Sequence, residues 1–155
     1  MLNFTNGFPG AISRAVDDIV VSLKNAADTE IPFGAPVFKV SGERSCQPYS
    51  DGLTGDEFLG FAVRIPSKTP DTYGSNRAGY GADDPVDVLT RGSIVLELAN
   101  TAHPGNSVYL RKADGKLVTS PGAEGTTIQL PNCTVRSSRD TAHCAEVVVT
   151  KRNIF

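Results

Sequence analysis

GYGADDPVDVLTRGSIVLEL, residues 79–98, joins a turn rich in glycine and aspartate to a long apolar run. In the run, Ile94, Leu96 and Leu98 fall on one side of an extended chain and Glu97 on the other, which is typical of a strand with one buried face. Ahead of it, Asp84 and Pro85 are turn residues, since aspartate bonds its own backbone and proline fixes φ. The stretch therefore predicts a turn that leads into a strand.

The same alternation occurs in two other segments. At residues 58–65 the odd-numbered positions are large and apolar, whereas Gly60, Ala62 and Arg64 occupy the even ones, so we expect a half-buried strand. The odd positions of residues 145–149 repeat the pattern beside Glu146. Leu59, Phe61, Ile94, Leu96, Val147 and Val149 are the expected core.

Turn signals separate further short strands. Asp114 and Gly115 lie between two apolar segments and predict a hairpin with a two-residue turn, because both can adopt positive φ. Weaker strands are expected at residues 36–40, 86–90, 126–130 and 133–136. With 15 glycines and 10 prolines, the pattern indicates an all-β chain of about nine or ten short strands, arranged as a sandwich or barrel.

The N-terminal part of the chain is open to two interpretations. Residues 11–27 repeat apolar side chains at helical spacing, yet they contain the β-branched run Ile19, Val20 and Val21, which favours a strand. We expect residues 1–30 to form an arm or a helix or strand segment, and residues 31–155 to form one β-domain. Phe4, Phe8 and Ile12 are an apolar series that either docks on a neighbouring subunit or folds onto its own core.

Charge and composition exclude several classes of partner. Fifteen lysines and arginines stand against seventeen aspartates and glutamates, a formal charge of −2, so neither nucleic acid nor a membrane surface is an expected partner. The start, MLNFTNGFPG, lacks the basic and apolar blocks of a signal peptide, and no apolar run reaches the roughly 20 residues of a spanning helix. We expect a soluble chain that is not exported by that route.

Three aspartates, Asp83, Asp84 and Asp87, offer oxygens to a cation such as Ca²⁺. Their spacing does not match the calcium-binding helix-loop-helix motif, which alternates its ligands over about 12 residues. We therefore expect these carboxylates to bend the chain and keep the loop hydrated, and we expect no bound metal or other cofactor.

Cysteine and histidine are the remaining chemistry-bearing residues. Cys46, Cys133 and Cys144 are odd in number and widely spaced, so free, buried thiols are expected. His143 and Cys144 are adjacent and would point to opposite faces of a strand, which argues against a shared zinc ion. With only His103 and His143 as bases and no nucleophile motif, an enzyme such as a hydrolase is not expected.

Residues 66–84 lack apolar periodicity and predict a long surface loop, exposed and poorly ordered at residues 66–81. Its tyrosines, Tyr73 and Tyr80, are candidate contact residues. They are also the only obvious pair for stacking on a sugar in a chain without tryptophan. A carbohydrate-binding or host-attachment module displayed on a virion is therefore the alternative function.

Four segments in order resemble the head cement and decoration proteins of tailed bacteriophages: IPFGAPV at 31–37, FLGFAVR at 58–64, the stretch at 79–98 and PGNSVYL at 104–110. The resemblance spans residues 31–150. It implies a jelly-roll-like β-domain without catalytic activity that binds the outside of an assembled capsid.

From this resemblance we expect a virion structural protein that bridges neighbouring major capsid proteins and stabilises the head. It would be assembled in the bacterial host cytoplasm and located on the capsid exterior. Its expected partners are the major capsid protein and itself, as a dimer or trimer. The candidate contact residues are Phe4, Phe8, Ile12, Tyr73 and Tyr80. We also expect that residues 1–10 can be deleted without unfolding the β-domain.

Overall fold

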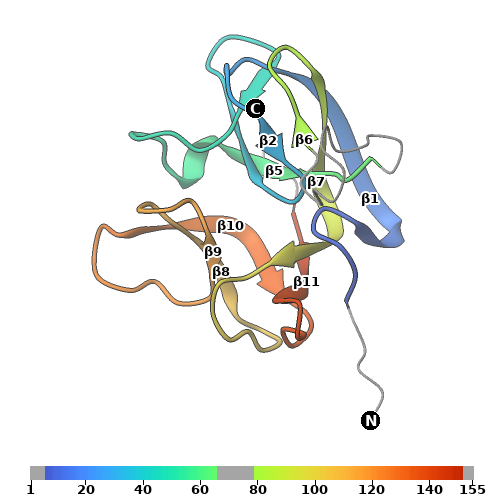
Figure 1. Ribbon diagram of the computed structural model, residues 1–155, viewed down its shortest axis with the longest axis vertical. Coiled ribbons are helices and arrows are strands. Elements are labelled where there is room, and N and C mark those ends of the chain that lie inside the picture. The colour runs from blue at the N-terminus through green and yellow to red at the C-terminus, as the bar shows by residue number, and fades with distance from the viewer. Residues whose placement is uncertain (1–5, 66–78, 152–155) are drawn as a thin grey trace.

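The computed structural model describes residues 6–65 and 79–151, which consist almost entirely of strands and loops (Figure 1). A single 3-10 turn, η1 (Gly55–Glu57), precedes β5. The strands are β1 (Ile12–Asn25), β2 (Ile31–Pro32), β3 (Pro36–Lys39), β4 (Ser45–Gln47), β5 (Phe58–Ala62), β6 (Gly79–Tyr80), β7 (Pro85–Glu97), β8 (Ser107–Arg111), β9 (Leu117–Val118), β10 (Thr127–Val135) and β11 (Cys144–Val149). The all-β prediction is confirmed, although β1 and β7, with 14 and 13 residues, are longer than expected.

Five of these strands close into a ring. The main sheet has the order β1-β4-β3-β5-β7-β11-β10-β8-β9, and β1 also pairs with β7, so that β1, β4, β3, β5 and β7 form a small barrel. β7 continues beyond the barrel and carries β11, β10, β8 and β9 as an open sheet (Figure 1). β2 and β6 pair separately, with Ile31 opposite Tyr80. β7, which follows Asp83 and Asp84 and contains Asp87, thus belongs to both the barrel and the open sheet.

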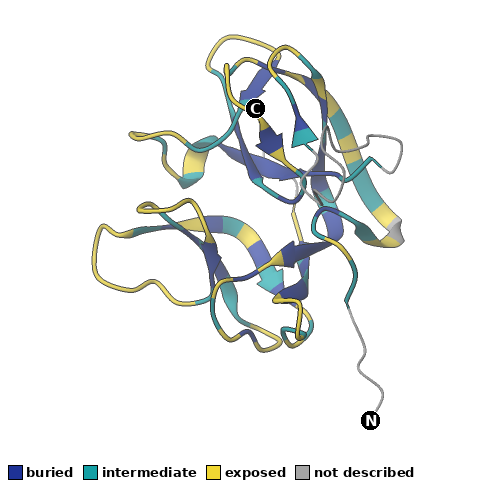
Figure 2. Ribbon diagram, in the orientation of Figure 1, coloured by how far each residue is buried: buried dark blue, intermediate teal, exposed yellow. Residues whose placement is uncertain are grey.

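The protein has two hydrophobic cores, and β5 lies between them. Leu59 and Ala62 belong to the core lined by the barrel strands, whereas Phe58 and Phe61 belong to the core shared with the open sheet. Every residue of β5 is buried (Figure 2). The expectation of a half-buried strand at 58–65 is therefore wrong, because a second layer covers the face assigned to solvent. The six expected core residues are all buried.

A glycine is required where β5 crosses β7. A Cβ on Gly60 would lie 1.9 Å from the carbonyl oxygen of Leu89, far inside van der Waals contact. Gly60 thus sets how closely the two strands approach, and the sequence pattern had placed it on a solvent face.

Residues 12–25 form a strand, which settles the choice between helix and strand. From Val20 onward the exposed side chains alternate with more buried ones, down to Leu23 and Asn25. β1 pairs with β7 in antiparallel register, for example Val21 opposite Val88. The β-branched run prevails over the helical spacing because its side chains fit a pleated surface paired on one edge.

The hairpin at Asp114 and Gly115 is confirmed, but its turn is longer than expected. Tyr109 pairs with Val118, and the Arg111 N–H donates to the carbonyl of Lys116 at 2.8 Å, so the loop has four residues, 112–115. Only Gly115 adopts positive φ, at 70°. The two strands expected at 126–130 and 133–136 form one strand, β10.

Most of the loop expected at 66–84, including Tyr73, lies outside the described residues, as does Phe4. Within residues 6–65 and 79–151 no helix has the length and apolar character needed to cross a bilayer.

Candidate functional site

The three aspartates before β7 have three different partners. Asp83, at φ 62°, pairs with the Lys24 ammonium at 2.9 Å, and Asp84 Oδ2 accepts the N–H of Gly81 at 2.8 Å. Asp87 accepts the hydroxyl of Ser22 at 2.6 Å. The carboxylates therefore fix the turn and attach it to β1 rather than converge on one point. No group of three or more potential metal ligands occurs in the described part of the chain.

The three cysteines are all buried. All three are free thiols. Burial raises the pKa of Cys46 and of Cys144 to about 11 and also raises that of Cys133, so each thiol is protonated at neutral pH. A nucleophilic or metal-binding cysteine needs the opposite shift. His143 lies at φ 65° in the turn before β11.

Of the candidate contact residues that the structure describes, Phe8 offers the largest apolar surface. Its side chain is 63% exposed, and the Arg64 guanidinium carbon lies 4.6 Å from the centre of its ring. Ile12 begins β1 opposite Ile94 and packs partly against the core. Of the two, only Phe8 is available for extensive contact with another protein.

Tyr80 contributes to the interior instead. It is fully buried, its hydroxyl donates to the carbonyl of Val63, and its ring meets Phe33 edge to face at 5.4 Å between centroids. Burial raises the pKa of Tyr80 to about 12. The sequence suggested a loop tyrosine because Gly79 and Gly81 flank it; in the structure it lies on β6 and has no exposed surface for a partner.

The chain before β1 is fastened to the body at two points that sequence reasoning missed. Asn6 donates its side-chain amide to the carbonyls of Cys144 at 2.8 Å and Ser138 at 3.1 Å, and its N–H to Asp140 Oδ2 at 2.7 Å. Gly10 donates to the carbonyl of Val95 and accepts the N–H of Arg64, each at 2.8 Å. Deleting residues 1–10 would remove both attachments, whereas a cut after residue 5 would leave both in place.

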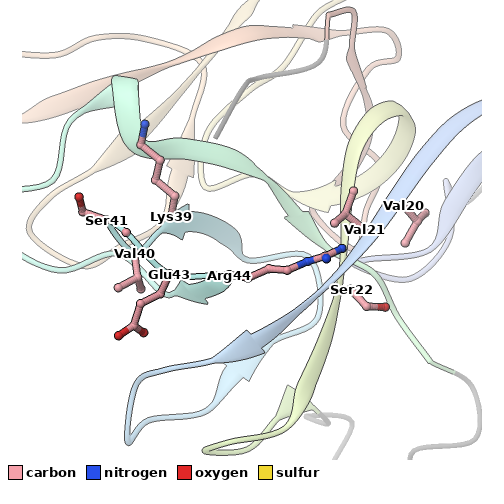
Figure 3. A pocket seen from close by; sticks show the side chains of 9 residues that line it. Val20, Val21, Ser22, Lys39, Val40, Ser41, Glu43 and Arg44 are labelled. Carbon is pink, nitrogen blue, oxygen red and sulfur yellow. The ribbon is translucent and has the colours of Figure 1, made fainter.

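A groove of about 830 Å³ opens where β1 leaves β4. β1 and β4 pair only at Lys24 and Asn25, and the β3–β4 turn then diverges, leaving Val20, Val21 and Ser22 facing residues 39–44. Figure 3 shows the Arg44 side chain reaching across toward Val21. Val20 is 41% exposed, and with Phe8 it is one of two exposed large apolar residues in the described chain. A partly open edge strand of this kind is a site where another chain can pair.

Comparisons with known proteins identify relatives of the whole chain. A family model described as "Structural cement protein (E217 gp24/Pam3 gp6)" matches residues 1–150, including the N-terminal thirty residues. A chain in the solved structure titled "The capsid of Myoviridae Phage XM1" has a TM-score of 0.77 at 16% identity, covering 98% of this chain and 95% of that one, so the two share a fold. The head fiber gp8.5 N base of bacteriophage phi29 has a TM-score of 0.43 at 10% identity, covering 88% and 99%. No curated protein matches.

Proposed function

Since this chain belongs to the phage structural cement protein family, we propose that it binds the outside of an assembled capsid, bridges neighbouring major capsid proteins and stabilises the head. The observation that carries the proposal is the match to the family over residues 1–150, nearly the full sequence. We propose further that it acts without catalysis, nucleic acid or membrane, as a dimer or trimer. It would join the head in the bacterial host cytoplasm.

Many weak contacts are sufficient for this function. A protein that binds only the assembled lattice stabilises it by RT ln(1 + [L]/Kd) at each site, about 2.7 kcal/mol at a hundredfold excess over Kd. Repetition over a symmetric shell multiplies that effect. A rigid β-body suits the role, because little conformational entropy is lost on docking.

Bridging requires at least two separate contact surfaces. The structure offers Phe8 with Arg64 above its ring, and the open edge of β1 at Val20. An exposed aromatic ring gives much contact area at small entropic cost, which makes Phe8 the better anchor. Of the other candidate contacts, Ile12 is at the rim of the core, and Phe4 and Tyr73 remain proposals from the sequence alone.

The test is to add the protein to shells that lack it and to follow binding and shell melting. We expect saturable binding and a higher disruption temperature with the full-length chain. Phe8→Ala and a form lacking residues 1–5 should bind more weakly while melting normally as free proteins. Absence of binding to shells, together with saturable binding on a glycan array, would replace this proposal by the attachment-module function.

A further inference from the structure

A second hollow lies where the first part of β1 pairs with β7. Its volume is about 580 Å³, and it is lined by Arg14, Asp17, Arg91, Gly92, Ser93, Arg136, Val148, Val149 and Thr150. Three register pairs run across four strands here: Arg14 opposite Ser93, Ser93 opposite Val148, and Val148 opposite Thr134. The hollow is thus built on paired strands, which fix the backbone positions of the residues that line it.

A bulge in β1 gives the hollow its wall. Arg14 and Ile19 pair with Ser93 and Arg91, so four residues of β1, 15–18, lie opposite one residue of β7, Gly92. The extra residues fold over Gly92, at φ 125°, where a Cβ would lie 3.0 Å from Cα of Asp18. Bulges of this kind are frequent beside functional sites because they redirect side chains.

Three arginines and one aspartate, Asp17, line the hollow, and the carboxylates of Glu146 and Asp18 lie beside it. Arg14 Nε lies 2.8 Å from Glu146 Oε1, and Arg91 Nη2 lies 2.8 Å from Asp17 Oδ2. Arg136 is exposed, and its side chain has no hydrogen bond or ion pair within the described residues. Arg136 is therefore the one arginine of the lining whose side chain has no carboxylate partner among the described residues. The Arg91–Asp17 pair is exposed on both sides and can exchange partners at little cost, whereas the Glu146 side chain is only 16% exposed.

The floor of the hollow holds a second unused donor. Ser93 is 4% exposed, and no hydrogen bond of its hydroxyl occurs in the part of the chain that the structure describes. Buried hydroxyls normally find an acceptor. The Ser93 hydroxyl can donate to any hydrogen-bond acceptor, and the Arg136 guanidinium favours one that carries negative charge. An anionic oxygen ligand satisfies both.

We propose that this hollow receives a carboxylate side chain from an acidic loop of the capsid surface. Arginine binds a carboxylate through two parallel N–H groups, and Val148 offers apolar surface to the same loop. A single carboxylate has enough oxygens to pair with the Arg136 guanidinium and to accept the hydroxyl of Ser93. This inference rests on the proposed function, because it names the chemistry by which the shell is recognised.

Charge reversal in the full-length chain tests the inference. Arg136→Glu should weaken binding to shells that lack the protein by about tenfold or more at about 0.05 M NaCl, and the difference should shrink at about 0.5 M. Ser93→Ala should weaken binding by about fivefold, as expected for the loss of one hydrogen bond. Lys112→Glu, in the exposed β8–β9 turn, makes the same charge change outside the hollow and should bind like the unchanged protein. Melting of each free variant shows that it is folded.

The outcomes separate the two proposals. If the unchanged protein binds shells and Arg136→Glu binds as tightly as Lys112→Glu, the hollow is not the contact and the inference is overturned while the function stands. If the unchanged protein binds no shells, both are overturned. If Arg136→Glu abolishes binding of a DNA oligonucleotide and leaves shell binding unchanged, the hollow is a phosphate site. Competition for shells by a hexaglutamate peptide, lost in Arg136→Glu, supports the carboxylate assignment.

Discussion

Replacing Phe58 by alanine removes an inner ring from a chain of four, which runs from Tyr49 through Phe38 and Phe58 to Phe61. Phe58 is fully buried, and its ring lies 5.9 Å from that of Phe38 and 5.2 Å from that of Phe61, both edge to face. Truncation of a buried phenylalanine costs about 3–5 kcal/mol, and each ring pair adds about 0.5–1.5 kcal/mol that is partly included in that figure. Because β5 is packed on both faces, the residues around the cavity have little room to relax into it. We therefore expect Phe58→Ala to lower the free energy of unfolding by about 4–5 kcal/mol, the upper part of that range.

Phe8→Ala is the matched control, since the same change is made where the ring is 63% exposed. Only a fraction of the burial and one exposed cation–π contact are lost, so about 1 kcal/mol or less is expected. Urea unfolding followed by circular dichroism measures both variants, with unchanged m values as the sign of two-state behaviour. A cost below about 2 kcal/mol for Phe58→Ala, or equal costs for the two variants, would refute the two-core description.

Four further predictions concern the interior, the turns and the chain start. Gly60→Ala should prevent close pairing of β5 with β7 and lower the melting temperature strongly, whereas Gly81→Ala, whose Cβ would meet Asp84 at 3.4 Å, should be tolerated; equal melting temperatures would contradict this. Ellman's reagent should find no reactive thiol in the folded protein at pH 8 and three after denaturation, because burial holds the thiol pKa values at about 11 or above; rapid labelling of native protein would show an exposed cysteine. Hydrogen bonds from Arg111 lower the pKa of Asp114 to about 2 from an ordinary 3.8, so the support that this carboxylate gives the hairpin is complete above that ordinary value and is lost as pH falls through about 2; an NMR titration midpoint near 3.8 would contradict the contact. Deleting residues 1–10 should lower the melting temperature more than deleting residues 1–5, since only the longer cut removes Asn6 and Gly10; equal melting would show that these attachments contribute nothing.

Strands could be predicted where one side of the chain is buried. Buried and less buried residues alternate along β8 and along most of β11. In β1 the β-branched run indicated a strand, although the apolar residues also recur at helical spacing. The exposure of β5 was predicted wrongly because both of its faces are covered, and a strand with two buried faces need not alternate apolar and polar residues. Phe58, which starts β5, was overlooked as a core residue for that reason.

Contacts between distant residues could not be read from the sequence. Asn6 meets Cys144 across 138 positions, and Arg14, Arg91 and Arg136 come together only because β1, β10 and β11 assemble around β7. Tyr80 looked like a loop residue because the pairing of β6 with β2, which buries it, depends on a partner 49 positions away. Local composition identifies turns and strands, whereas the surface sites depend on the order of strands in the sheet.

The central proposal, that the chain is a structural component of the phage head, is tested most directly by counting its copies in purified virions. Quantitative mass spectrometry should find it at a fixed ratio to the major capsid protein, comparable to one, with DNA-filled heads losing stability when it is stripped off. Absence from virions, or a few copies confined to one vertex or the tail, would contradict the account.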